Sequence, residues 1–176
     1  MRVLGIDPGS RFCGYGVVED AGAARVRHLE HGVIALDGKT SIEARLVVLY
    51  AELTLALAKH RPTMVAIEDI YFARNAQSAL VLGQARGVAL LAAAQSGAVV
   101  RCFPASVIKQ AVTGSGRAEK DQVGRMVNAL LGITVTERVD ASDALATAIC
   151  GLLRAREPLL TAAPPRTRPL QLRKRG

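Results

Sequence analysis

The sequence has no tryptophan, few other aromatic residues and only three cysteines. Three tyrosines and three phenylalanines are its whole aromatic content among 176 residues. Cys13, Cys102 and Cys150 are odd in number, lie far apart and include no Cys-x-x-Cys pair. This pattern predicts reduced thiols in the core, and it argues against a disulfide framework or a zinc site.

Long apolar runs are also missing. The longest candidate, residues 76–94, is interrupted by Gln84 and Arg86, whereas about 20 apolar residues in succession are needed to cross a bilayer. The short apolar run near Met1 ends at Asp7 and does not fit a signal peptide. We therefore expect a cytoplasmic protein that does not associate with membranes. Half of the residues are hydrophobic and 22% are charged, which excludes an intrinsically disordered chain.

Positive charge is concentrated at the carboxyl end. Residues 154–176 contain seven basic residues and one acidic residue, which is +6 of the net charge of +8. We expect residues 1–156 to form one folded domain and residues 157–176 to form a disordered basic tail that contains proline and arginine. Such a tail either aids solubility or tethers the protein to a polyanion such as a nucleic acid.

The order of the expected elements predicts the fold. Strands are expected over residues 2–6, 12–18 and 24–36, with short links that favour an antiparallel meander. Thr40 and Glu43 have the spacing of a capping box at the start of a helix. Further strands are expected over 64–67 and 98–103, and further helices over 76–94, 106–112, 120–131 and 142–153. The result is an α/β fold with a mixed five-stranded sheet flanked by helices, in which the first and fourth strands are neighbours.

Four acidic residues lie at the ends of apolar elements. Asp7 and Glu68 each end a predicted strand, and Asp140 and Asp143 lie three residues apart at the start of the last helix. Each has an ordinary role when taken alone, as a turn residue, a solvated strand end or a helix cap. Together, at one edge of the sheet, they would repel each other by about 4 kcal/mol per pair at 4 Å. A divalent cation would relieve that repulsion, and an all-oxygen ligand set favours Mg²⁺ or Mn²⁺ over zinc.

Carboxylates that hold two such ions are typical of enzymes that cleave phosphodiesters. The histidines offer no better metal site, because His28 and His31 are three residues apart in a predicted strand and should face opposite ways.

Basic residues and two aromatic residues suggest how a phosphodiester is bound. Lys109, Arg117 and Lys120 flank a segment loosened by glycines, although the segment lacks the closing Gly-Lys-Ser/Thr of a P-loop. Tyr71 and Phe72, followed by Arg74, come soon after Glu68; they either stack on an unpaired base or pack in the core. Gly83 and Gly87 in the second long helix allow close approach of another helix, within the fold or across a dimer.

The sequence resembles the RuvC Holliday junction resolvases, which have a ribonuclease H-like fold. The resemblance rests on the order and spacing of several fragments and extends to about residue 153. These fragments are Gly5-Ile6-Asp7-Pro8-Gly9, Ala66-Ile67-Glu68, Asn75-Ala76-Gln77-Ser78-Ala79-Leu80, Leu82-Gly83-Gln84-Ala85-Arg86-Gly87, Ala118-Glu119-Lys120 and Asp140-Ala141-Ser142-Asp143-Ala144-Leu145-Ala146.

The resemblance implies a homodimer that nicks two strands of a four-way DNA junction symmetrically, leaving 5′-phosphate and 3′-hydroxyl ends. It implies Mg²⁺ or Mn²⁺ as cofactor and the branch-migration proteins RuvA and RuvB as partners, and the carboxylate chemistry described above favours two ions in each site. By motif, Asp7, Glu68, Asp140 and Asp143 match the metal-binding catalytic acids, and Lys109 and Lys120 match contacts to the phosphates near the scissile bond. Tyr71 replaces the phenylalanine that is more familiar in this family.

Two other functions fit the same pattern of acidic residues. One is a different ribonuclease H-like phosphotransferase, such as an RNA–DNA hybrid nuclease or a transposase-like nuclease. The other is a junction-binding protein with an inactive metal site, which the complete set of acids disfavours. Actin-like kinases share the Asp-x-Gly opening, but they need about twice this length.

Overall fold

A computed structural model describes residues 1–23, 25–69, 76–135 and 138–156. It contains strands β1 (Arg2–Asp7), β2 (Phe12–Asp20), β3 (Val26–Ala35), β4 (Met64–Asp69) and β5 (Val99–Pro104). Its helices are α1 (Ile42–His60), α2 (Ala76–Gln95), α3 (Ala105–Thr113), α4 (Lys120–Leu131) and α5 (Val139–Arg156). None of the helices in the described ranges is long and apolar enough to span a membrane.

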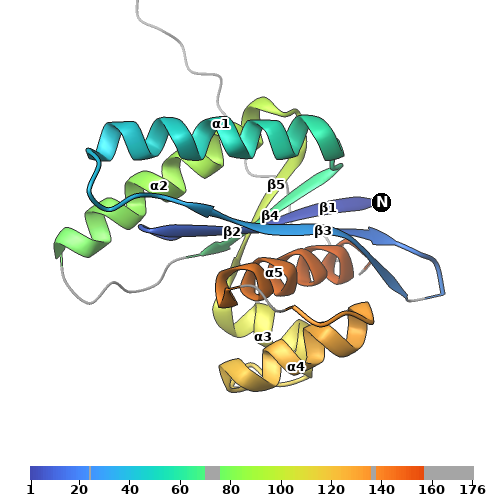
Figure 1. The fold of residues 1–176 in the computed structure, drawn as a ribbon. Coiled ribbons are helices and arrows are strands. Elements are labelled where there is room, and N and C mark those ends of the chain that lie inside the picture. Colours follow the sequence, from blue (N-terminus) through green and yellow to red (C-terminus); the bar gives the residue numbers. More distant parts are fainter. Residues whose placement is uncertain (24, 70–75, 136–137, 157–176) are drawn as a thin grey trace, which may run out of the picture.

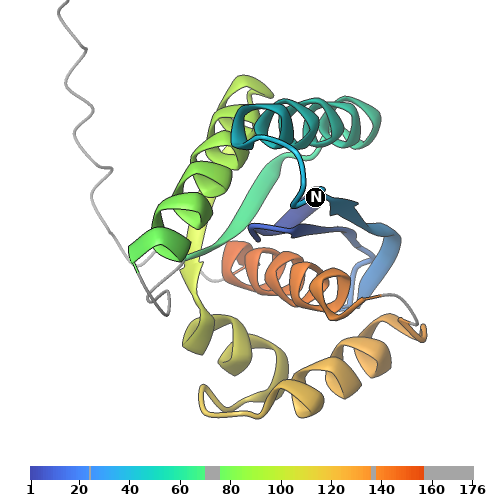
Figure 2. The same ribbon diagram turned by 60° about the vertical axis from the view of Figure 1, so that its left-hand side comes forward.

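The five strands form one mixed sheet in the order β3-β2-β1-β4-β5. β1, β2 and β3 pair antiparallel, whereas β4 runs parallel to both β1 and β5. Helices α1 and α2 cover one face of the sheet and α3, α4 and α5 cover the other (Figures 1 and 2). The predicted ribonuclease H-like architecture is therefore confirmed, including the adjacency of the first and fourth strands.

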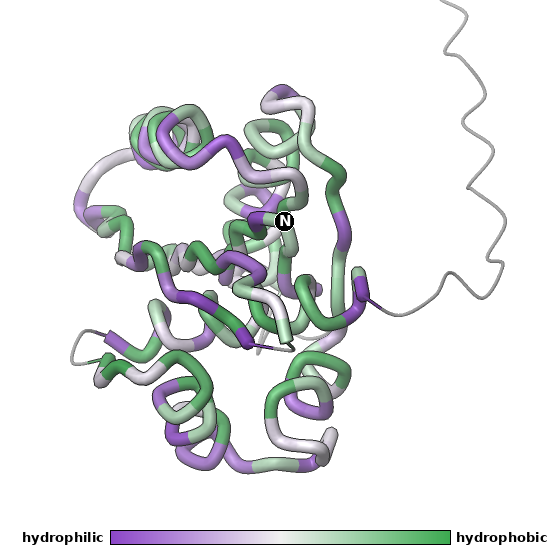
Figure 3. Tube along the Cα trace, turned by 90° about the vertical axis from the view of Figure 1, so that its right-hand side faces the viewer, coloured by the Kyte–Doolittle hydropathy of each residue, from purple (hydrophilic) through white to green (hydrophobic). Residues whose placement is uncertain are grey.

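Each face of the sheet has its own hydrophobic core. Leu4, Ile6 and Ile67 pack with α1 and α2 on one side, while Val3 and Ala66 pack with α5 on the other. Because β1 and β4 are covered on both faces, their sequences are continuous apolar runs, as expected for central parallel strands. The helices on both sides alternate between hydrophobic and hydrophilic residues, shown in green and purple in Figure 3.

Three local predictions are wrong. The N-cap of α1 is Ser41 and not Thr40, and Ser41 makes no side-chain cap hydrogen bond. Thr40 does not form the predicted capping box, because its hydroxyl donates to the carbonyl of Asp37 in the preceding turn (2.8 Å). α5 begins at Val139, three residues before the expected start. Cys13 and Cys150 are buried as expected, but Cys102 is exposed because β5 is an edge strand.

The two histidines of β3 do not face opposite ways, contrary to the prediction. The pairing of β2 with β3 shifts between Val17 and Val18, so that Val17 lies opposite Glu30 and Val18 opposite His28. This β-bulge adds one residue to β3 and breaks the alternation that the prediction assumed. His28 Nε2 lies 2.8 Å from His31 Nδ1 on the same face of the sheet.

Candidate active site

Two parallel strands deliver the first two acids to one place. In the register of β1 and β4, Ile6 lies opposite Ile67, so Asp7 and Glu68 follow at adjacent strand ends. The buried strands fix both backbones, while both acids are only partly buried. The sheet therefore places a pair of carboxylates at the carboxyl ends of its central strands, where α/β proteins commonly bind ligands.

Helix α5 crosses the sheet closely enough to bring two more acids to this point. A Cβ atom on Gly5 would lie 2.2 Å from the carbonyl oxygen of Ala144, and a Cβ atom on Gly14 would lie 2.0 Å from that of Asp140. These contacts are shorter than any side chain permits, so glycine is required where α5 lies on β1 and β2. The first turn of α5, with Asp140 and Asp143, is thereby held beside Asp7.

Burial and the charges of neighbouring acids raise the pKa of Asp7, Glu68 and Asp143. Burial raises the pKa of Asp7 to about 8, and the charges of Glu68, Asp143 and Asp140 add to that rise. Burial also raises the pKa of Glu68, with a further contribution from Asp143, while a hydrogen bond between the Glu68 and Asp7 side chains acts in the opposite direction. The four acids therefore form one electrostatic unit in which like charges lack sufficient compensation.

Two lysines lie against this unit. Lys120 Nζ is 2.7 Å from Asp143 Oδ2, and the charge of Lys109 lowers the pKa of both Glu68 and Asp143. Burial alone would lower the pKa of Lys120, but its bond to Asp143 and the nearby acids raise it. A cavity of about 220 Å³ is lined by two of these acids and both lysines, from α3, α4, α5 and β4. The site thus combines carboxylates with cations that are suited to phosphate oxygens.

The acids fit a hard divalent cation by their chemistry, because every donor is a carboxylate oxygen and they carry an excess of negative charge. In this structure Lys120 forms an ion pair with Asp143, and Arg138 Nε lies 3.3 Å from Asp140 Oδ2. Over the described ranges, no three histidine, cysteine or acidic side chains are placed to hold one ion. The expected gathering of three or four carboxylates within 4 Å is therefore incomplete. Asp7 and Glu68 are in direct contact, whereas Asp140 and Asp143 are paired with basic residues.

The remaining predicted site residues are placed as follows. Arg117 is exposed in the loop between α3 and α4, and this loop is anchored by the buried Ala118. Tyr71 and Arg74 lie outside the described residues. The loop thus presents an exposed cation, and within the part of the chain that the structure describes Arg117 forms no ion pair with the four acids.

Sequence reasoning missed two arginines near the site. The Arg138 guanidinium lies 3.5 Å from the centre of the Phe12 ring as well as beside Asp140. Arg86 Nη2 lies 2.6 Å from Asp69 Oδ1, one residue beyond Glu68. Arg138 has no spacing that marks it in the sequence, whereas Arg86 lies within the fragment over residues 82–87 that carries part of the family resemblance. The glycines under α5 did carry a signal, because isolated glycines within predicted strands indicate close backbone approach.

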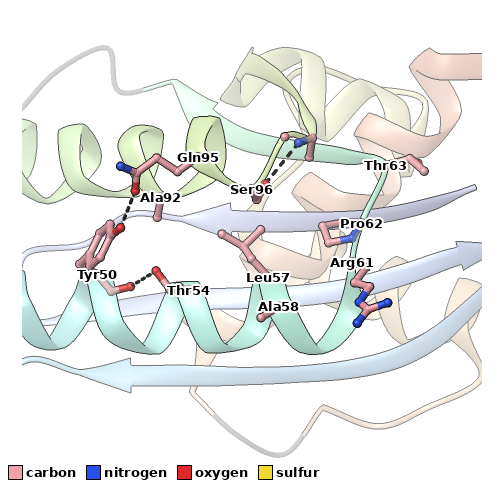
Figure 4. A pocket seen from close by; sticks show the side chains of 12 residues that line it. Tyr50, Thr54, Leu57, Ala58, Arg61, Pro62, Thr63, Ala92, Gln95 and Ser96 are labelled. Carbon is pink, nitrogen blue, oxygen red and sulfur yellow. Dashed lines mark hydrogen bonds between the residues drawn. The ribbon is translucent and has the colours of Figure 1, made fainter.

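A larger cavity, of about 670 Å³, lies at the opposite end of the sheet (Figure 4). It is bounded by α1 from Tyr50 onward, by the last turn of α2 and by the residues that precede β4 and β5. The Tyr50 hydroxyl donates to Gln95 across it, and Arg61 is its one charged lining residue. Without a carboxylate in its lining, this cavity does not compete as a site for divalent cations.

Comparisons with known proteins agree on one family. The family model described as "Crossover junction endodeoxyribonuclease RuvC" matches residues 3–151. The chain is 49% identical to the protein of that name from Pelobacter propionicus over 152 residues, covering 86% of each chain. It is 52% identical to the one from Myxococcus xanthus over 158 residues, covering 89% of this chain and 82% of the relative.

Among solved structures, T. thermophilus RuvC in complex with Holliday junction substrate superimposes with a TM-score of 0.83 at 35% identity. The match covers 89% of this chain and 95% of that chain.

Proposed function

Because the chain belongs to the RuvC family of crossover junction endodeoxyribonucleases, we propose that it resolves four-way DNA junctions in recombination and repair. It is a structure-selective endonuclease that nicks two strands symmetrically and leaves 5′-phosphate and 3′-hydroxyl ends. Its catalysis depends on divalent metal ions, as is typical of the family. One observation supports this function above all: Asp7 and Glu68 meet at adjacent strand ends, and α5 is held against them with two further acids.

Asp7, Glu68, Asp140 and Asp143 are the metal-binding catalytic acids in this proposal. We assign them two Mg²⁺ ions in each site, with Mn²⁺ as a substitute, because all their donor atoms are carboxylate oxygens. When bound, such ions activate a water molecule and stabilise the leaving oxygen. The chain itself orients the carboxylates through the β1–β4 register and the contact of α5 with the sheet.

The cations around the acids hold the DNA backbone. Lys109 and Lys120 line the same cavity as Glu68 and Asp143, and this shared lining supports their assignment as contacts to a phosphate held at the acids. In this proposal the Lys120 ammonium would pair with a phosphate oxygen in place of Asp143 when DNA is bound. Arg117 contacts the backbone farther out, and Tyr71 and Arg74 contact an unpaired base and its phosphate.

Two copies of the chain are proposed to act together, because a four-way junction offers two equivalent strands and a two-fold dimer matches that symmetry. The face of α2 that turns away from the sheet supports this. Leu80 and Leu91 are 64% and 52% exposed, and Gly83 and Gly87 lie between them with open space before their backbones. These four positions share one stripe of the helix and would admit a second helix at close range.

RuvA and RuvB are the proposed partners for branch migration, and the cytoplasm is the proposed location. We assign nuclease activity to residues 1–156. The tail over 157–176 lies outside the described residues, and its seven-to-one excess of basic residues, counted from Arg154, suits a tether to DNA.

The decisive test compares a synthetic four-way junction, a linear duplex and an RNA–DNA hybrid as substrates in Mg²⁺. We expect cleavage of the junction and little of the others. Asp7→Asn should abolish nicking while junction binding is retained, because the asparagine keeps the shape of the side chain and loses a ligand charge. Glu52→Gln, an exposed change on α1, is the matched control. Cleavage of the hybrid alone, or nicking by Asp7→Asn at the wild-type rate, would contradict the proposal.

A further inference from the structure

The β-bulge in β3 creates a pair of histidines that the four acids do not use. His28 Nε2 and His31 Nδ1 lie 2.8 Å apart. Their rings are tilted by 54° with centroids 4.9 Å apart, so the nitrogens approach each other edge to edge and the rings are not stacked. Both side chains are half-buried, which leaves a water-accessible side.

The arrangement is built into the backbone. Leu29 and Glu30 are the two residues between the histidines, and both face α1: Leu29 packs on that core, and Glu30 accepts hydrogen bonds from Tyr15 and Lys59. Glu30 is also 2.8 Å from His60. Two consecutive residues on one face are what a bulge produces. The packing of Leu29 and the bonds of Glu30 therefore fix the histidines on the opposite face, toward α5.

The distance between the nitrogens matches a chelating pair. Two imidazole nitrogens that each lie about 2.0–2.1 Å from one ion are about 2.8–3.0 Å apart when they form a right angle at that ion, and about 3.3–3.4 Å apart at a tetrahedral angle. The observed 2.8 Å agrees with the right angle. Right angles between ligands occur in tetragonal and octahedral complexes, which Cu²⁺ and Ni²⁺ favour with nitrogen ligands.

From this geometry we infer that His28 and His31 form a second, independent metal site, which takes a borderline divalent transition ion such as Ni²⁺ or Cu²⁺ and completes its coordination with water. In the hydrogen-bonded pair, one of the two facing nitrogens carries a hydrogen. When an ion binds, that hydrogen moves to the other nitrogen of the same ring, so that both facing lone pairs reach the ion and no net proton is released.

The electrostatic state of the pair suits this role. Burial lowers the pKa of His28 and the neighbouring His31 lowers it further, so His28 is held in the neutral form that binds metals. Mg²⁺ prefers oxygen ligands and would not compete for the two nitrogens. β2 lies between β1 and β3 in the sheet. On β2, Gly14 pairs with Asp7 of β1, whereas Gly16, two residues farther along, pairs with His31 of β3. The two sites are thus distinct in position and in ligand chemistry.

The test is Ni²⁺ binding to the full chain at neutral pH, measured by titration calorimetry in excess Mg²⁺. We expect one Ni²⁺ per chain in the wild type and in Asp7→Asn. We expect binding at least about tenfold weaker in His28→Gln and His31→Gln. Removing a residue that only hydrogen-bonds to a metal ligand already lowers metal affinity about tenfold or more, and these variants remove a ligand itself. His60→Gln changes the third histidine and is the matched control. Unaltered Ni²⁺ affinity in both of the first two histidine variants would overturn the site.

A second measurement does not depend on any histidine variant folding. Cu²⁺ bound to Asp7→Asn should give an electron paramagnetic resonance spectrum with hyperfine coupling to two imidazole nitrogens. Coupling to one nitrogen or to none would overturn the inference.

Discussion

Asp7 is the residue at which function and stability conflict most directly. Its folded-state pKa of about 8 lies far above the ordinary 3.8, mainly because of burial. A carboxyl group whose pKa is raised by folding stabilises the protein fully below its unfolded pKa, and this stabilisation is lost as the pH rises through the folded value. The unfolding free energy of the metal-free protein should therefore fall as the pH rises from about 4 to about 8, because of Asp7.

Asp7→Asn should remove this pH dependence. In the presence of EDTA, we expect the variant to gain at least about 2 kcal/mol in unfolding free energy over the wild type between pH 6 and pH 9, at about 1.4 kcal/mol for each pKa unit. Urea unfolding at the two pH values measures the gap, and Glu52→Gln should show none. Mg²⁺ should stabilise the wild type at pH 8 more than the variant. A gap that does not widen with pH would show that Asp7 is already ionised at pH 6.

Lys120 provides a second prediction at the scale of the residue. Its side chain is 63% exposed even though it forms an ion pair with Asp143, so a phosphate can reach it. Lys120→Ala should weaken junction binding and reduce the slope of log affinity against log salt by about 1, because one fewer counterion is released. Lys59→Ala on α1, on the far side of the sheet, should leave the slope unchanged. An equal slope in Lys120→Ala and the wild type would remove Lys120 from the DNA contacts.

At the scale of the element, the contact of α5 with the sheet decides whether the site forms. The helix touches β1 and β2 through glycines, so the backbone of its first turn is positioned by main-chain contact rather than by interlocking side chains. Small errors in that contact would move Asp140 and Asp143 together.

Gly14→Ala tests this directly. The added methyl group would lie 2.0 Å from the carbonyl oxygen of Asp140, and overpacking of this kind costs about 1–3 kcal/mol. We expect lower stability and a loss of nicking that exceeds the loss of binding. Gly124→Ala is the control, because its methyl group would meet only Ser142 Oγ at 3.7 Å within a helix. Thermal unfolding and single-turnover nicking report both effects, and normal nicking by Gly14→Ala would refute the role of this contact.

The same elements show what the sequence could and could not predict. The apolar runs and their periods were enough to predict the strand order. A strand that is apolar on both sides can be buried only in the middle of a sheet that is covered on both faces. The acids at strand ends could be found for the same reason. The start of α5 and the N-cap at Ser41 could not, because they depend on competing local bonds such as that of Thr40 with Asp37. The β3 bulge was also beyond reach, since it is set by contacts of Leu29 and Glu30 with a distant helix.

At the scale of the whole molecule, the exposed stripe of α2 bears on how two copies associate. Leu91→Glu should weaken dimerisation at least about tenfold if this stripe is the interface, since a charge would be buried against an apolar helix. Sedimentation across a concentration series measures the change. Leu55→Glu, on α1 at 64% exposure, should leave association unchanged. If Leu91→Glu sediments like the wild type, the copies meet elsewhere.

The glycines beneath α5 also bear on how this enzyme fails. A genetic screen for heat-sensitive alleles should recover changes at Gly5 and Gly14, positions that have no side chain with which to bind an ion. Such alleles would leave every acidic residue intact and still yield an inert protein at the restrictive temperature. Placing the four acids on another sheet would give no activity unless that sheet also had glycines where the last helix contacts its strands.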